Sequence, residues 1–64
     1  MPVINVAMGP VSEDQKKALI ERLTSEAAII TKMGAENFIV LINEIPFENI
    51  GVGGKTIKDI KSGK

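Results

Sequence analysis

Apolar positions gather in two short runs that flank one long amphipathic stretch. Residues 2–8 are mostly apolar and β-branched, and Gly9-Pro10 ends this run. Such a segment predicts a strand followed by a break. Residues 38–42 form a second, continuously apolar run. A run of this kind is typical of a strand buried on both faces, as in a parallel pair joined by a helical crossover.

The stretch between the two runs carries the signals of a helix. Ser12 is followed by two carboxylates and then by Gln15, which predicts a capping box and suits the positive end of the helix dipole. The periodicity extends to Met33, and Gly34 is expected to close the helix in the left-handed conformation. Apolar residues recur at spacings of three and four. They are Leu19, Leu23, Ala27 and Ile30.

The order strand, helix, strand predicts a βαβ unit with a parallel pair of strands. A two-stranded sheet with one helix is a small structure, and its free edges can pair with another copy. Ile20 and Ile29 widen the apolar surface of the helix beyond one stripe. We therefore expect the helix to be covered on more than one side, which a lone chain cannot do.

The segment after Pro46 has a different character. Residues 51–54, Gly-Val-Gly-Gly, predict a sharp turn or small hairpin, and residues 56–60 predict a last helical turn. The glycines match neither the dinucleotide fingerprint nor the Walker spacing, so a structural turn is favoured over a phosphate-binding loop. The sequence predicts an α+β fold: a βαβ subunit with a short C-terminal hairpin, in one domain spanning residues 1–64.

Composition excludes several kinds of chemistry. The 64 residues include no cysteine and no histidine, so Ser-His and Cys-His nucleophilic pairs are excluded and a zinc site is improbable. We expect no metal and no cofactor. Eight basic side chains balance eight acidic ones and only two residues are aromatic, which argues against a nucleic-acid partner. No apolar run approaches the roughly 20 residues of a membrane span. A cytoplasmic protein without a membrane partner is expected.

Pro2 has two interpretations. Proline is tolerated at the first residue of a strand, because the N–H that it lacks would be unpaired there. If Met1 is removed, however, Pro2 carries a free secondary amine, and α-amino groups titrate near pH 7.7–8.0, close to the pH at which a general base works best. Burial lowers this pKa further.

Other polar groups are weaker candidates. Asn43 and Glu44 end the second strand and need partners, and a satisfied structural pair is favoured over a catalytic one. The Lys16-Lys17 pair and the lysines of the C-terminal segment favour a solvated surface over an anion site.

Several landmarks occur in order along residues 2–60. They are Pro2 behind Met1, the Ser-Glu-Asp-Gln-Lys sequence at 12–16, Asn43-Glu44 and Gly-Val-Gly-Gly at 51–54. Together they resemble the 4-oxalocrotonate tautomerase family. The resemblance implies a homo-oligomer: a dimer with a four-stranded sheet and two helices on one face, commonly assembled into a hexamer. It also implies an isomerase without a cofactor, in which Pro2 is the catalytic general base for keto-enol proton transfer on a small enol or 2-keto/2-hydroxydienoate acid.

The chain departs from this family at three positions. The resemblance implies an arginine just before the helix cap, another in the second strand and a phenylalanine before the glycine-rich tail, but these places hold Val11, Ile39 and Ile50. Arginines bind carboxylates strongly and directionally. We therefore expect an apolar substrate pocket that includes Ile39 and Ile50 and is less suited to a dianion. The alternative is a non-catalytic self-associating or small-ligand-binding protein with the same fold, which retention of Met1 would favour.

Overall fold

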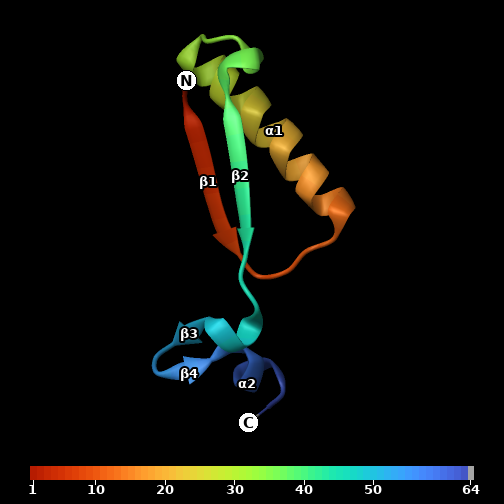
Figure 1. The fold of residues 1–64 in the computed structure, drawn as a ribbon, viewed down its shortest axis with the longest axis vertical. Helices are drawn as coiled ribbons and strands as arrows, with labels where there is room; N and C mark the ends of the chain where they lie inside the picture. Colours follow the sequence, from red (N-terminus) through yellow and green to blue (C-terminus); the bar gives the residue numbers. More distant parts are fainter. Residues whose placement is uncertain (64) are drawn as a thin grey trace.

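The computed structural model describes residues 1–63 and has the α+β architecture that the sequence predicts (Figure 1). Both predicted strands, the long helix, the hairpin and the final helical turn are present. The elements in chain order are β1 (Val3–Met8), α1 (Glu13–Thr31), the 3-10 turn η1 (Ala35–Asn37), β2 (Ile39–Glu44), the 3-10 turn η2 (Phe47–Asn49), β3 (Gly51–Val52), β4 (Lys55–Thr56) and α2 (Ile57–Lys61).

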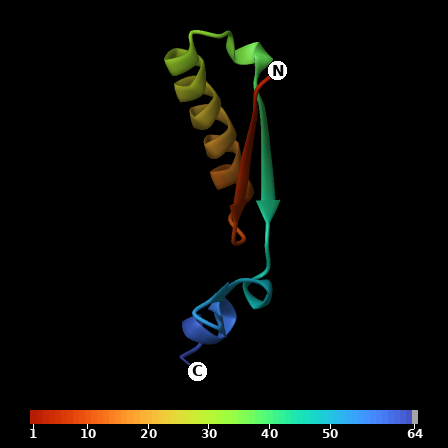
Figure 2. The same ribbon diagram turned by 90° about the vertical axis from the view of Figure 1, so that its left-hand side faces the viewer.

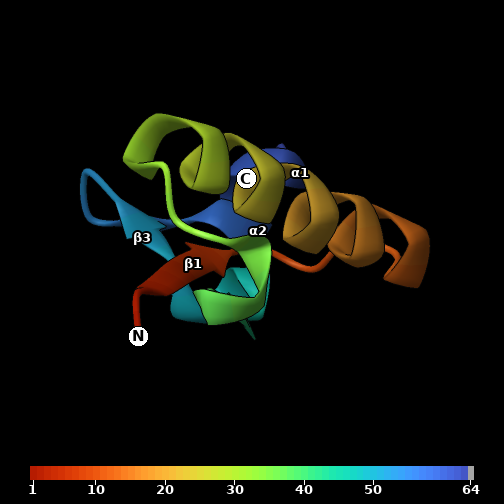
Figure 3. The same ribbon diagram turned by 90° about the horizontal axis from the view of Figure 1, so that it is seen from above.

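Strands β1 and β2 form a parallel pair in which Val3 lies opposite Ile39 and Met8 lies opposite Glu44. Helix α1 packs over one face of this pair and leaves the other face open (Figures 2 and 3). Exposed and half-buried side chains accordingly alternate along β1 and most of β2. The expectation that residues 38–42 are buried on both faces is wrong for one chain: Leu41 is 47% exposed, because the chain has one long helix and it covers one face.

The start of α1 is as predicted and its end is not. Ser12 Oγ accepts a hydrogen bond from the Gln15 N–H at 3.1 Å, and Gln15 Oε1 accepts one from the Ser12 N–H at 2.9 Å, which completes the capping box. The helix ends at Thr31, and Lys32 takes the left-handed conformation with φ 59°. Gly34 does not: its φ is −67°. The helix ends early after three β-branched residues, 29–31, whose stiff side chains disfavour helix.

The C-terminal segment folds against itself. Gly53 and Gly54 have φ values of 61° and 86°, which is the conformation of a type I′ hairpin turn and explains the two glycines there. The Thr56 hydroxyl accepts a hydrogen bond from the Asp59 N–H and caps α2. The structural interpretation of residues 51–54 as a turn is therefore confirmed.

This C-terminal segment lies beyond the carboxyl ends of β1 and β2, at the opposite end of the molecule from the N-terminus (Figure 1). Phe47 connects it to the βαβ unit, because its ring packs so closely on Gly9 that a Cβ there would approach the ring to 2.6 Å. The Lys61 ammonium lies 5.1 Å from the centre of the same ring. The chain is consequently elongated, with extents of 46 × 23 × 15 Å.

Two further observations concern the described residues. None of them is fully buried, so one chain has no closed hydrophobic core. Within residues 1–63, no helix combines the length and the apolar character needed to cross a membrane.

Candidate active site

Pro2 lies immediately before β1 and is half-buried, whereas Met1 is 86% exposed. Its carbonyl oxygen accepts a hydrogen bond from the Ile39 N–H at 3.0 Å, which fixes the start of β1 against the start of β2. With Met1 present, the Pro2 nitrogen is part of a peptide bond and has no basic lone pair. The hydrogen bond to β2 fixes the position of Pro2. The basicity of its nitrogen depends on whether Met1 is present.

Ile39 is the predicted site residue that the fold brings next to Pro2. It opens β2 opposite Val3 and is 39% exposed. The surface that continues from it along the open face of the sheet carries no charged side chain. The side chains of this face are Val3, Asn5, Ala7, Ile39, Leu41 and Asn43.

Ile50 is not brought to Pro2 by its own chain. It lies between η2 and β3, where it is half-buried and its carbonyl oxygen accepts a hydrogen bond from the Ile57 N–H at 2.8 Å. This segment and the N-terminus occupy opposite ends of the molecule (Figure 1). A pocket that contains Pro2, Ile39 and Ile50 therefore requires more than one copy of the chain.

Glu44 has a structural role. One carboxylate oxygen accepts a hydrogen bond from the Val11 N–H at 3.1 Å, and the other lies 2.6 Å from the Lys16 Nζ. The hydrogen bond from Lys16 and that from Val11 hold the pKa of Glu44 below its ordinary value. Glu44 therefore has the partners that a polar group at the end of this strand was expected to need, and it joins the end of β2 to the loop and first turn of α1.

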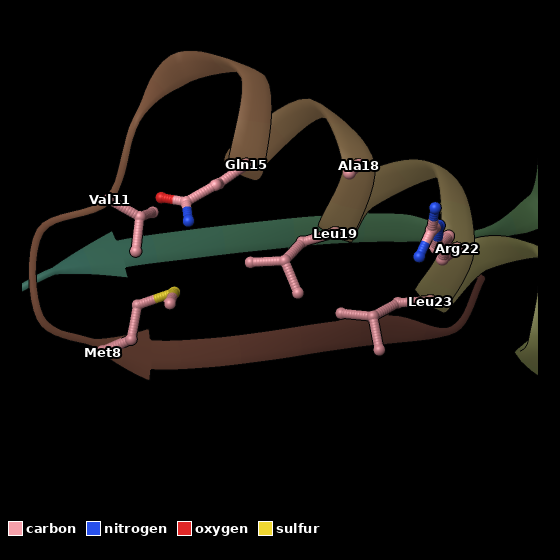
Figure 4. Close-up of a pocket in the computed structure, with 7 residues that line it drawn as sticks. All are labelled: Met8, Val11, Gln15, Ala18, Leu19, Arg22 and Leu23. Atoms are coloured by element: carbon pink, nitrogen blue, oxygen red, sulfur yellow. The ribbon is translucent and has the colours of Figure 1, made fainter.

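The groove between α1 and β1 is a feature that sequence reasoning missed. Its volume is about 350 Å³, and the side chains that line it come from one flank of the helix, from the loop before it and from the end of β1 (Figure 4). The signal was the spacing of Gln15, Ala18 and Arg22, which places them on the flank beside the leucine stripe. The lining residues are Met8, Val11, Gln15, Ala18, Leu19, Arg22 and Leu23. Of the three predicted site residues, Pro2, Ile39 and Ile50, none lines it.

Acidic side chains in the described part of the chain do not gather into a group of three that could hold a metal ion. At the Pro2 end, η1 carries the polar side chains Glu36 and Asn37 just before β2. Removal of Met1 would add the α-amino nitrogen of Pro2 to the polar groups at this end.

Comparison with known proteins defines the class of protein to which this chain belongs. The profile of the family described as "Tautomerase enzyme" matches residues 2–60. A probable tautomerase of Bacillus cereus is 38% identical over 60 residues, which is 92% of this chain and 98% of the relative. The 2-hydroxymuconate tautomerase of Comamonas testosteroni is 41% identical over 51 residues, covering 77% of this chain and 78% of the relative.

The crystal structure of DmpI from Archaeoglobus fulgidus superimposes on this chain with a TM-score of 0.85, and the two sequences are 45% identical. The match covers 91% of this chain and 100% of that one. The chain belongs to the 4-oxalocrotonate tautomerase family of the tautomerase superfamily. Membership supports a tautomerase, and hence an isomerase, activity.

Proposed function

We propose that this protein is a tautomerase in which Pro2, freed by removal of Met1, is the general base. The observation that carries the proposal is that the family match begins at Pro2 itself and that relatives matched over nearly the whole chain are named as tautomerases. The amine lone pair of Pro2 removes a proton from the enol oxygen or from the carbon next to the carbonyl. The resulting secondary ammonium returns that proton to the other end of the delocalised system, so the reaction needs no net change in charge or oxidation state.

The environment of Pro2 suits a base. The ring is half-buried, and the side chains that follow on the open sheet face are uncharged. Because desolvation disfavours the protonated amine, covering this end of the molecule lowers the pKa of the amine toward neutrality. A general base with a pKa near the working pH contributes about 10²–10⁴-fold to the rate.

The substrate that we propose is a small enol or a 2-keto or 2-hydroxydienoate acid. A 2-hydroxydienoate fits the printed name of the Comamonas testosteroni relative, a 2-hydroxymuconate tautomerase. Ile39 and Ile50 line the pocket in this proposal, and because they lie at opposite ends of one chain, they come from different subunits. We therefore propose a homo-oligomer, a dimer with a four-stranded sheet and two helices on one face that assembles further into a hexamer.

The test is ketonisation of phenylenolpyruvate or a 2-hydroxydienoate by the wild type and by Pro2→Ala, with Pro10→Ala as the matched control. Intact mass of each purified protein establishes whether Met1 is absent. We expect Pro2→Ala to lose about 10²-fold or more in kcat/KM and Pro10→Ala to keep the wild-type rate. Equal rates in the wild type and Pro2→Ala contradict the proposal and favour a non-catalytic or ligand-binding protein, as does retention of Met1 in the native protein.

A further inference from the structure

We propose that the Pro2 site accepts an enol acid with a single carboxylate and an apolar tail, and that Ile39 and Glu36 select against a second carboxylate. This inference rests on the proposed function and narrows its substrate class. It concerns what the site binds rather than how Pro2 moves a proton, so the binding of unreactive acids tests it separately from the proposed chemistry.

The first argument is the position of Ile39 and Glu36 beside Pro2. The Ile39 N–H donates a hydrogen bond to the Pro2 carbonyl at 3.0 Å, so these two residues are direct neighbours across the strand pair. Glu36 belongs to η1, the 3-10 turn that leads into β2. This turn and the N-terminus lie side by side in two perpendicular views (Figures 1 and 2). A substrate at the Pro2 nitrogen therefore lies next to the segments that carry both side chains.

The second argument is the apolar surface next to Pro2. Val3 lies opposite Ile39 on the open face of the sheet, Leu41 follows on the same face, and all three side chains are at least a third exposed. Apolar side chains provide no hydrogen-bond donor, so a carboxylate that loses water against them without a partner is strongly disfavoured. An apolar tail gains free energy from the same contact. This surface therefore distinguishes substrates by the group that lies away from the reacting enol.

The third argument is the negative charge at this end of the molecule. Helix α1 runs back from the carboxyl ends of the strands, so its C-terminus, which carries a partial negative charge, lies at the Pro2 end (Figures 1 and 2). Its last turn contains no basic residue. The Glu36 carboxylate lies so close to Gly34 that a Cβ there would overlap it. Glu36 is exposed and forms no ion pair within residues 1–63, so its charge is free to repel a second carboxylate.

The fourth argument is the distribution of basic side chains. Within residues 1–63, Lys32 is the basic residue that follows the end of α1 at the Pro2 end. The other basic residues belong to residues 13–22 of α1 or to the C-terminal segment, which lies at the opposite end of the molecule (Figure 1). They are Lys16, Lys17, Arg22, Lys55, Lys58 and Lys61. A single lysine at the Pro2 end suits a substrate with one carboxylate and leaves a second carboxylate without a partner.

The experiment compares two substrates that differ by one carboxylate, 2-hydroxypenta-2,4-dienoate and 2-hydroxymuconate. We expect the wild type to have a kcat/KM about tenfold higher for the monocarboxylate, because the second carboxylate is desolvated without a partner. Glu36→Gln is expected to narrow this ratio, whereas Glu21→Gln, which removes the same charge from an exposed position in the middle of α1, keeps it.

Substitutions of Ile39 test the apolar surface with the same two substrates. Ile39→Arg supplies a partner for the second carboxylate and is expected to reverse the preference, whereas Ile39→Leu keeps the surface apolar and the order of the two acids. A wild type that prefers the dicarboxylate overturns the proposal. So does a ratio that neither Glu36→Gln nor Ile39→Arg changes.

A second measurement uses the unaltered protein and does not depend on turnover, in case a variant does not fold. The binding of 2-oxohexanoate and of 2-oxohexanedioate, which have equal chain length, is followed by the backbone amide signals of Glu36 and Ile39 in NMR spectra. We expect the monocarboxylate to bind about tenfold more tightly and the difference to shrink at high salt, which screens the repulsion. Tighter binding of the dicarboxylate overturns the proposal, and so does the absence of binding by both acids. The expected order of binding without turnover of any enol contradicts the proposed chemistry alone.

Discussion

At the scale of single residues, Glu44 shows how one side chain joins segments that are distant in the sequence. Its carboxylate accepts hydrogen bonds from the Val11 N–H in the loop before α1 and from Lys16 in the first turn of the helix. These contacts hold the parallel strands and the helix start together at one end of the sheet. Because the contact between Glu44 and Lys16 is an ion pair, its contribution to stability depends on the charge of the carboxylate and therefore on pH.

Acidification is predicted to weaken this contact. The pKa of Glu44 is lowered in the folded state by the hydrogen bonds from Lys16 and Val11. A carboxylate with a lowered folded-state pKa stabilises the fold fully above its unfolded-state pKa, and this stabilisation is lost as the pH falls through the folded-state value. We expect urea unfolding of the wild type to show this loss only below the ordinary pKa of a glutamate, as the pH falls on through the lowered folded-state pKa of Glu44, and Glu44→Gln to be less stable at neutral pH but to lose less on acidification.

The exposed carboxylate Glu48 provides the control for that measurement. Glu48→Gln removes the same charge from the η2 turn, and among the described residues the Glu48 side chain makes no hydrogen bond or ion pair with Lys16 or Val11. It is expected to follow the wild-type pH dependence. If Glu44→Gln and Glu48→Gln respond identically, the contact of Glu44 with the helix start does not contribute to acid sensitivity.

At the scale of elements, the helix start could be predicted because its cause is local. The capping box depends on Ser12 and Gln15 alone, and both hydrogen bonds are present. The helix end was placed incorrectly because a left-handed residue was assigned by its propensity to Gly34, whereas Lys32 takes that conformation. A solvent-exposed residue other than glycine can take the left-handed conformation at a modest energetic cost. The propensity of glycine alone therefore does not locate the end of the helix.

Replacing the cap residue gives a direct test at this scale. Ser12→Ala leaves the Gln15 N–H without its acceptor and is expected to cost about 1 kcal/mol of stability. Ser25→Ala is the matched control, since Ser25 is exposed in the middle of α1 and alanine is the better helix former there. Chemical denaturation of both variants checks the difference. A Ser12→Ala variant as stable as Ser25→Ala contradicts the role of the cap.

At the scale of the whole molecule, prediction from the sequence reached the order of the elements. The patterns of residues 2–8 and 38–42 were enough for the parallel pair, which brings Ile39 beside Pro2. The position of Ile50 could not be predicted, because the C-terminal segment extends away from the sheet and the turn residues at 51–54 indicate a local turn but not the direction in which the segment leaves β2. The groove beside α1 was missed because helical spacing alone does not show that the flank with Gln15, Ala18 and Arg22 stays uncovered next to the end of β1.

The open sheet face and the free edge lead to a prediction about stability. None of the described residues is fully buried, and several large apolar side chains, such as Val3, Ile39 and Leu41, are at least a third exposed. Burial of apolar surface is the main favourable term in folding, and we expect contacts between copies to supply the part of that term that one chain leaves exposed. Folding and association are then one reaction, and the midpoint of unfolding has to rise with protein concentration.

For a dimer that unfolds to separate chains, each tenfold increase in concentration adds about 1.4 kcal/mol of apparent stability, and a larger assembly adds more. Urea denaturation followed by circular dichroism over a hundredfold range of concentration measures this slope, and its size gives the number of chains that unfold together. The Ser12→Ala variant serves as an internal check, because a lost cap lowers the midpoint at every concentration without changing the slope. A midpoint that is constant across the range would mean that one chain folds alone with its sheet face open, and the dependence of the Pro2 pocket on neighbouring subunits would then have to be abandoned.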